Sequence, residues 1–213
     1  MIDFYGKTPV FGIGGNLQTV NVNVAYRRVS SRQGDGDAAP CAEGLINPKT
    51  TRTEIYLVQD LSREDFAVPS IGAIVGGWHI DSIAVAYSAE WPRVEVSGHV
   101  HNGLPHVSVA RIYAPSIALP VGYGRFPDCA GDAASSAVYR LTANHKDLFD
   151  DECVPRFATD YDGKETLEVK ALTDEVCAPS DDWLDLSLKT AEDISKAVAR
   201  TFLFEHHIRG VAA

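Results

Sequence analysis

The segment "GGWHIDSIAVAYSAEWPRVEVSGHV", residues 76–100, decides the fold class that this sequence favours. Apolar side chains alternate with polar ones along both halves, and this period of two is typical of a strand with one buried face. The alternating apolar positions are Ile83, Val85, Tyr87, Val94, Val96 and Val100. Because the short stretch "SAEWP" (88–92) separates the two halves, we predict a β-hairpin with this connection.

Other segments with strand character lie on both sides of this hairpin. They are residues 17–28, 52–60, 106–113, 137–144 and 164–172. In the first of them, "LQTVNVNVAYRR", the residues Val20, Val22 and Val24 alternate with polar residues, and this pattern predicts a half-buried strand. The chain as a whole therefore favours antiparallel β structure.

The period changes near the C-terminus. In residues 190–207, "TAEDISKAVARTFLFEHH", the apolar residues Ala191, Ile194, Val198 and Phe202 lie three or four positions apart. We predict a helix here. Together with the strands, this describes one β-rich domain over residues 1–213, an antiparallel β-sandwich or barrel with a C-terminal helix.

Residues 29–51, "VSSRQGDGDAAPCAEGLINPKTT", are rich in Ser, Gly, Asp and Pro and have no periodicity. Structureless loops longer than about 15 residues are uncommon inside compact domains, and they tend to be functional or disordered. We therefore expect an extended loop or arm. It either reaches a neighbouring subunit or forms a surface insertion, and the sequence leaves both readings open.

The composition is that of a soluble globular protein. Of the 213 residues, 45% are hydrophobic and 23% are charged, and the formal net charge is −10. No apolar run approaches the roughly 18 residues of a membrane helix, and we expect no secretory signal. The acidic balance disfavours binding to a nucleic acid backbone. The four cysteines lie far apart, and we expect reduced thiols.

The segment "VEVSGHVHNGLPH", residues 94–106, raises the question of a metal site. It contains His99, His101 and His106 within eight positions. Two histidines at i and i+2 of a strand share one face, so this pair has the spacing of a chelate.

The alternation of the strand favours a different interpretation. The face that carries the histidine pair also carries Arg93, Glu95 and Ser97, whereas the opposite face carries valines and a glycine. We therefore predict that the histidines continue a solvated polar face and bind no metal. The alternative is a metal bound by all three histidines, or with a distant partner such as His79 or His145.

The segment "TDYDGKE", residues 159–165, has oxygen ligands at Asp160 and Asp162, as a calcium loop would. A calcium loop also needs a glutamate at its twelfth position, which here is Ala171. We predict instead that Asp162-Gly163 forms a hairpin turn before the strand 164–172. No group of residues has the mutual support that catalysis requires, so we expect no catalytic residue and no cofactor.

The hairpin arm "WHIDSIAVAYS" (78–88) and the strand "VEVSGHVHNGLPH" (94–106) resemble segments of virion structural proteins of tailed phages, particularly tube-forming tail proteins. The resemblance covers residues 78–113 and extends to "YDGKETLEVKAL" (161–172). It implies a β-sandwich or barrel core, a long loop that reaches an adjacent subunit, and a helix packed on one side. It implies no catalytic residues.

These observations favour a self-assembling virion structural protein that is not an enzyme. It would form a ring or tube in a phage tail or head–tail connection and assemble in the host cytoplasm. Its partners would be copies of itself and other virion proteins, bound through sheet edges and the arm, without membrane or sequence-specific nucleic acid binding. Two alternatives stay open: a small metal-dependent β-barrel enzyme that uses the His-x-His site, and a monomeric ligand-binding β-sandwich.

Overall fold

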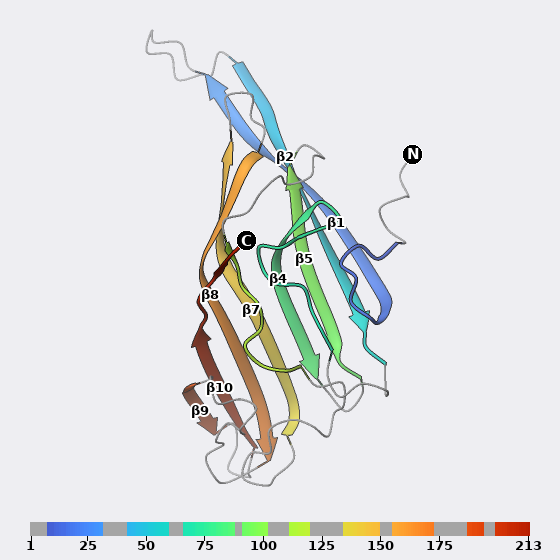
Figure 1. Ribbon diagram of the computed structural model, residues 1–213, viewed down its shortest axis with the longest axis vertical. Helices are drawn as coiled ribbons and strands as arrows, with labels where there is room; N and C mark the ends of the chain where they lie inside the picture. The colour runs from blue at the N-terminus through green and yellow to red at the C-terminus, as the bar shows by residue number, and fades with distance from the viewer. Residues whose placement is uncertain are drawn as a thin grey trace.

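Long antiparallel strands account for most of the structure (Figure 1), a computed structural model that describes residues 8–31, 42–59, 66–87, 91–101, 111–119, 134–149, 155–172, 187–193 and 199–213. The strands of the main sheet are β1 (Asn16–Ser31), β2 (Ala42–Leu57), β3 (Ile74–Val75), β4 (Trp78–Tyr87), β5 (Arg93–His101), β7 (Ala134–Phe149), β8 (Pro155–Leu172), β9 (Ser187–Asp193) and β10 (Ala199–His207). A separate two-stranded sheet pairs β6 (Arg111–Ile112) with β11 (Val211–Ala212).

The main sheet is open. Its strand order is β1-β2-β5-β4-β7-β8-β10-β9, and β3 pairs with β4 beside this path. β1 and β9 are therefore its two edges. The prediction of a mainly β, antiparallel protein is confirmed, and within the described residues the sheet does not close into a barrel. None of these segments contains a helix long and apolar enough to cross a membrane.

The predicted hairpin is present as β4 and β5. Ile83 pairs with Val96 and Val85 pairs with Val94, and all four side chains are buried. They pack with residues of the neighbouring strands and with loop residues that cover this face. The buried core also includes Tyr56, Tyr139, Leu141, Leu167, Val169, Phe202 and Phe204 from the sheet and Phe11, Ile13, Ile71, Tyr113, Ile117 and Leu119 from the covering segments.

The expected loop at residues 29–51 is strand at both ends. β1 and β2 stay paired from Ala25 and Lys49 out to Ser31 and Ala42, so they project as a two-stranded arm beyond the other strands (Figure 1). An arm is therefore present, but 29–31 and 42–51 are not structureless. These residues form strands without a periodic sequence pattern because cross-strand backbone pairing does not require side chains to alternate between apolar and polar. Residues 32–41 lie outside the described residues, as do all four cysteines.

The predicted C-terminal helix is wrong. Within residues 190–207, β9 and β10 pair with each other, and β10 also pairs with β8; residues 194–198 lie outside the described residues. Phe202 and Phe204 are buried opposite Val169 and Leu167, with Leu203 between them half-buried. The period that decides the structure is the two-residue spacing of these aromatic side chains, which pack well on a pleated sheet.

The predicted hairpin turn at Asp162-Gly163 is also wrong, because β8 continues through both residues. The register with β7 shifts here, since Thr142 pairs with Lys164 whereas Asn144 pairs with Tyr161. Asp162 has a positive φ of 53° at this point. The Asp162-Gly163 pair therefore marks a β-bulge and not a turn, and the two features look alike in sequence because both use left-handed backbone.

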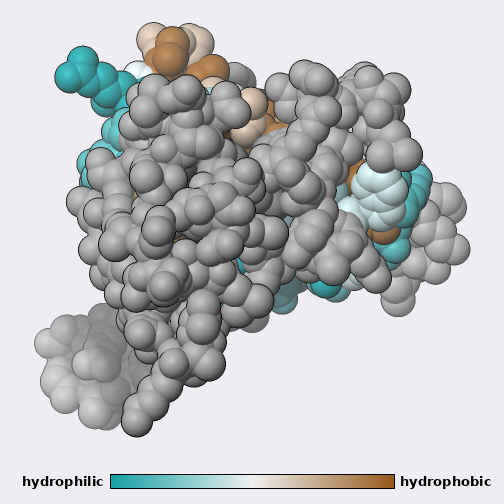
Figure 2. Space-filling model, turned by 90° about the horizontal axis from the view of Figure 1, so that it is seen from below, coloured by the Kyte–Doolittle hydropathy of each residue, from teal (hydrophilic) through white to brown (hydrophobic). Residues whose placement is uncertain are grey.

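The edge strand β1 is more exposed than its alternation predicts. Val22, Val24 and Tyr26 are 44%, 45% and 55% exposed, so the prediction of a half-buried strand is confirmed as a strand and wrong in burial. The view from below shows small hydrophobic areas beside hydrophilic ones on the described part of the surface (Figure 2). Because β1 is an edge of the main sheet, its exposed apolar side chains lie beside backbone groups that can pair with a strand of another chain.

Candidate metal centre

His99 and His101 lie at the end of β5 and are buried, with 0% and 5% of their surfaces exposed. The predicted solvated face is therefore wrong at these two positions. The alternation holds as far as Ser97, but every residue from Gly98 to His101 is buried. Side chains of β7 cover this end of β5, and the ring of Phe149 lies 4.9 Å from the ring of His101. His106 lies outside the described residues.

A β-bulge in β4 brings His79 beside His99. The pairing of β4 with β5 shifts by one residue at Asp81, which has no partner of its own in β5. Because side chains alternate along a strand, an extra residue inverts the alternation beyond it. Ile83 therefore faces the apolar core, whereas His79 lies on the side of His99, with which it pairs. The Asp81 carboxylate reaches the Nδ1 atoms of both histidines.

The next strands supply the other half of the site. β7 pairs with β4 only as far as Thr142, and its register with β8 shifts immediately afterwards. His145 and Asp147 follow on β7, two residues apart, and Asp160 pairs with His145 from β8. The two irregularities, one in β4 and one between β7 and β8, place side chains of four strands at one point.

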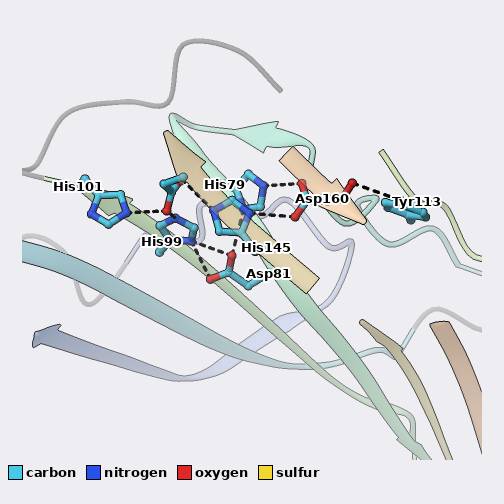
Figure 3. Close-up of polar contacts among 8 residues, drawn as sticks. His79, Asp81, His99, His101, Tyr113, His145 and Asp160 are labelled. Atoms are coloured by element: carbon cyan, nitrogen blue, oxygen red, sulfur yellow. Dashed lines mark hydrogen bonds and ion pairs between the residues drawn. The ribbon is translucent and has the colours of Figure 1, made fainter. Parts of the chain in front are cut away.

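These side chains form a closed ring in which carboxylates alternate with imidazoles (Figure 3), hereafter the His–Asp ring. The contacts around it are Asp160–His79 2.8 Å, His79–Asp81 3.0 Å, Asp81–His99 2.7 Å, His99–Asp147 3.2 Å, Asp147–His145 2.8 Å and His145–Asp160 2.9 Å. His101 joins from outside, with its Nε2 atom 2.8 Å from Asp147 Oδ2.

The ring is electrostatically balanced. Each of its three imidazoles approaches a carboxylate with both nitrogens. Burial disfavours the charged forms, but the contacts between opposite charges outweigh it, so the pKa of His79 is raised and that of His145 is raised to about 9. The same contacts hold the pKa values of the three aspartates below their usual range. Without a metal, the charged forms of His79 and His145 and those of the three carboxylates therefore stabilise one another.

The ring and the adjoining His101 contain two sets of donor atoms suited to a metal ion. One set is His79, His99 and His145, and the other is His99, His101 and Asp147. Within each set the donor atoms lie within 4.8 Å of one another. Imidazole nitrogens with carboxylate oxygens are a donor set that suits zinc, iron, nickel and copper.

Two glycines allow the strands to come this close. At Gly98 an added Cβ would lie 2.6 Å from the backbone oxygen of His79. At Gly72, where φ is +81°, it would lie 2.7 Å from Asp160 Oδ2. The Tyr113 hydroxyl donates a hydrogen bond of 3.2 Å to the Asp160 carbonyl (Figure 3). The position of the ring therefore depends on main-chain contacts as well as on its own charges.

Other buried carboxylates anchor the fold elsewhere. Glu54 accepts hydrogen bonds from the backbone N–H groups of Val10 and Phe11 and forms a 2.5 Å ion pair with Arg52. Glu165 accepts a 2.8 Å hydrogen bond from the Tyr139 hydroxyl and others from Ser116. These groups fasten covering segments to the sheet and offer no cluster of imidazoles.

Sequence reasoning considered His79 and His145 only as distant partners, and it missed Asp81 and Asp147. A signal for them was present, because His79-x-Asp81, His99-x-His101 and His145-x-Asp147 are three pairs of metal-binding residue types at strand spacing. Asp160 was noticed only for a calcium loop.

A search of known protein families and a search of curated proteins found no match to this chain. The assignment of a function therefore depends on the geometry of the His–Asp ring.

Proposed function

We propose that this protein binds a divalent transition metal ion in the His–Asp ring, and that the ion has a structural role. The observation that carries the proposal is the convergence of three fully or largely buried histidines, from three different strands, on one point. A metal ion held there would tie the hairpin of β4 and β5 to β7, which lies much later in the sequence.

The cost of burying charge supports a metal over a metal-free network. Each ionised group in a water-poor site loses several kcal/mol of hydration, and ion pairs often fail to compensate for this loss. A divalent ion replaces protons on the imidazoles and leaves the carboxylates to orient them, which is the usual arrangement around metal-bound histidine. Asp81 and Asp160 are placed for this orienting role.

The burial of the ring favours a structural over a catalytic ion. His79 and His99 are fully buried, and the most exposed ring member is Asp81, whose side chain is 22% exposed. Structural zinc sites are closed, whereas catalytic sites keep a position open for water or substrate. The metal-dependent enzyme that the sequence left open would need such a position.

Metal analysis of protein produced without a tag tests the proposal. We expect near-stoichiometric metal, removal of this metal by a chelator, and saturable rebinding of Zn²⁺ measured by calorimetry. At a free zinc concentration 100 times the dissociation constant, the ion would stabilise the fold by about 2.7 kcal/mol. For a protein of this size this corresponds to a rise of roughly 5 to 11 °C in melting temperature.

Matched variants make the test specific. His99→Gln is expected to weaken the binding of at least one zinc ion by 100-fold or more, whereas His207→Gln, at a histidine whose side chain is 69% exposed, is expected to bind as the parent does. If the first variant does not fold, Asp81→Asn replaces it, with a loss of roughly 10- to 100-fold expected for an orienting group. Folded parent protein that takes up no zinc, or a His99→Gln variant that binds normally, would exclude the proposal.

A second proposal concerns assembly. The β1 edge exposes three apolar side chains and extends into the arm, and this supports the expectation that copies of the chain join into a ring or tube, as a tailed-phage virion component would. Sedimentation and electron microscopy of the purified chain test it. A species that remains monomeric at high concentration would count against assembly and would leave the metal site unaffected.

A further inference from the structure

The number of donors in the His–Asp ring exceeds what one ion uses. A structural zinc ion takes four ligands. Here four imidazoles and three carboxylates lie in one connected cluster, and its two donor triads differ in two of their three members. A single ion in the first triad would leave His101 with no role in binding, although its side chain is 7% exposed and its Nε2 atom points at Asp147.

The Asp147 carboxylate lies between the two triads. Its Oδ1 atom is 2.8 Å from His145 Nε2, and its Oδ2 atom is 2.8 Å from His101 Nε2. One oxygen therefore faces each group of histidines. A carboxylate in this position can bind two ions at once, one through each oxygen, and paired ions in proteins lie about 3.5 to 4 Å apart.

We propose that the ring holds two metal ions bridged by Asp147. The first ion binds His79 and His145 together with Asp147 Oδ1. The second binds His99 and His101 together with Asp147 Oδ2. His99 is a member of both triads. Because Asp147 Oδ1 supplies the third ligand of the first ion, His99 can bind the second ion. This inference rests on the proposed metal binding and adds the number of ions and the bridging residue.

Titration of metal-free protein with Co²⁺ tests the inference, because cobalt reports its ligands by absorption and its neighbours by magnetic resonance. We expect two equivalents to bind the parent protein and the His207→Gln control. The two ions should be magnetically coupled, since they share Asp147. No thiolate-to-cobalt charge-transfer band is expected, because the ring contains only nitrogen and oxygen donors.

Two variants separate the ions. His101→Gln is expected to bind one equivalent, because only the second site uses this side chain. Asp147→Asn keeps the shape of the side chain but removes the bridging charge, so we expect this variant to lose the magnetic coupling and to bind one Co²⁺ equivalent. If circular dichroism shows that His101→Gln does not fold, Asp147→Asn alone tests the inference.

The failures are distinguishable. One equivalent in the parent protein would overturn the bridged pair and leave metal binding intact, whereas no uptake would overturn both. Two equivalents that survive both substitutions, or a thiolate band, would place the second ion elsewhere and overturn the inference.

Discussion

Replacing Gly98 by alanine tests whether the close approach of β4 and β5 positions the His–Asp ring. An alanine Cβ would lie 2.6 Å from the backbone oxygen of His79 and 3.2 Å from two ring carbons of Phe11. Ordinary contacts begin at 3.4 Å, so the β4 backbone would have to retreat by about 0.8 Å. The Phe11 ring can turn away. The His79 carbonyl cannot, because it belongs to a paired strand, and moving this backbone would also move the His79 side chain.

The expected cost is that of overpacking a core, roughly 1 to 3 kcal/mol of unfolding free energy. This corresponds to a fall of about 2 to 12 °C in melting temperature for a chain of this length. Urea unfolding followed by tryptophan fluorescence measures the loss, and zinc calorimetry measures the effect on the ring. We expect weaker zinc binding as well, because His79 moves relative to His99. A Gly98→Ala protein within about 0.5 kcal/mol of the parent, with unchanged zinc affinity, would refute the reasoning.

Three further outcomes are expected. In metal-free protein, the pKa of His145 is raised to about 9 from 6.5, so the stability that its protonation contributes is present below pH 6.5 and is lost as the pH rises through 9; urea unfolding across this range should show a fall that a His145→Gln variant lacks, and a flat parent profile would contradict it. Glu54→Gln removes the charge that balances buried Arg52 and should cost roughly 3 to 5 kcal/mol by the same assay; a loss below about 1 kcal/mol would show that the pair is not needed. Val24→Lys, at an exposed edge position, should leave stability within about 0.5 kcal/mol but reduce self-association in sedimentation, and unaltered association would argue against assembly through β1.

The hairpin of β4 and β5 was predictable because its evidence is local. Alternation of valines and isoleucines with polar residues is imposed by the two-residue period of a strand, and it needs no knowledge of distant segments. The same reasoning located β7 and β8 in part. It failed in 190–207, where two patterns coexist: apolar residues three or four positions apart, and Phe202 and Phe204 two positions apart. The structure follows the two-residue pattern, because β8 pairs with β10 and both phenylalanines are buried there.

The histidine pair shows the limit of the same method. Arg93 and Glu95 are exposed as the alternation requires, yet His99 and His101 on the same face are buried. Alternation tells which side of a strand a residue occupies, but it does not tell what covers that side along its length. Here the cover comes from β7, some 45 residues later in the chain.

Local periodicity was therefore enough to establish a mainly β, antiparallel protein and to place most of its strands, because backbone geometry enforces that pattern residue by residue. The assembly of the His–Asp ring, in contrast, was decided by tertiary structure alone. One inserted residue at Asp81 reverses the side on which His79 lies, and a register shift between β7 and β8 directs His145 and Asp147 toward it. Such irregularities depend on how strands pair with distant partners, so no single segment carries the information that brings these charges together.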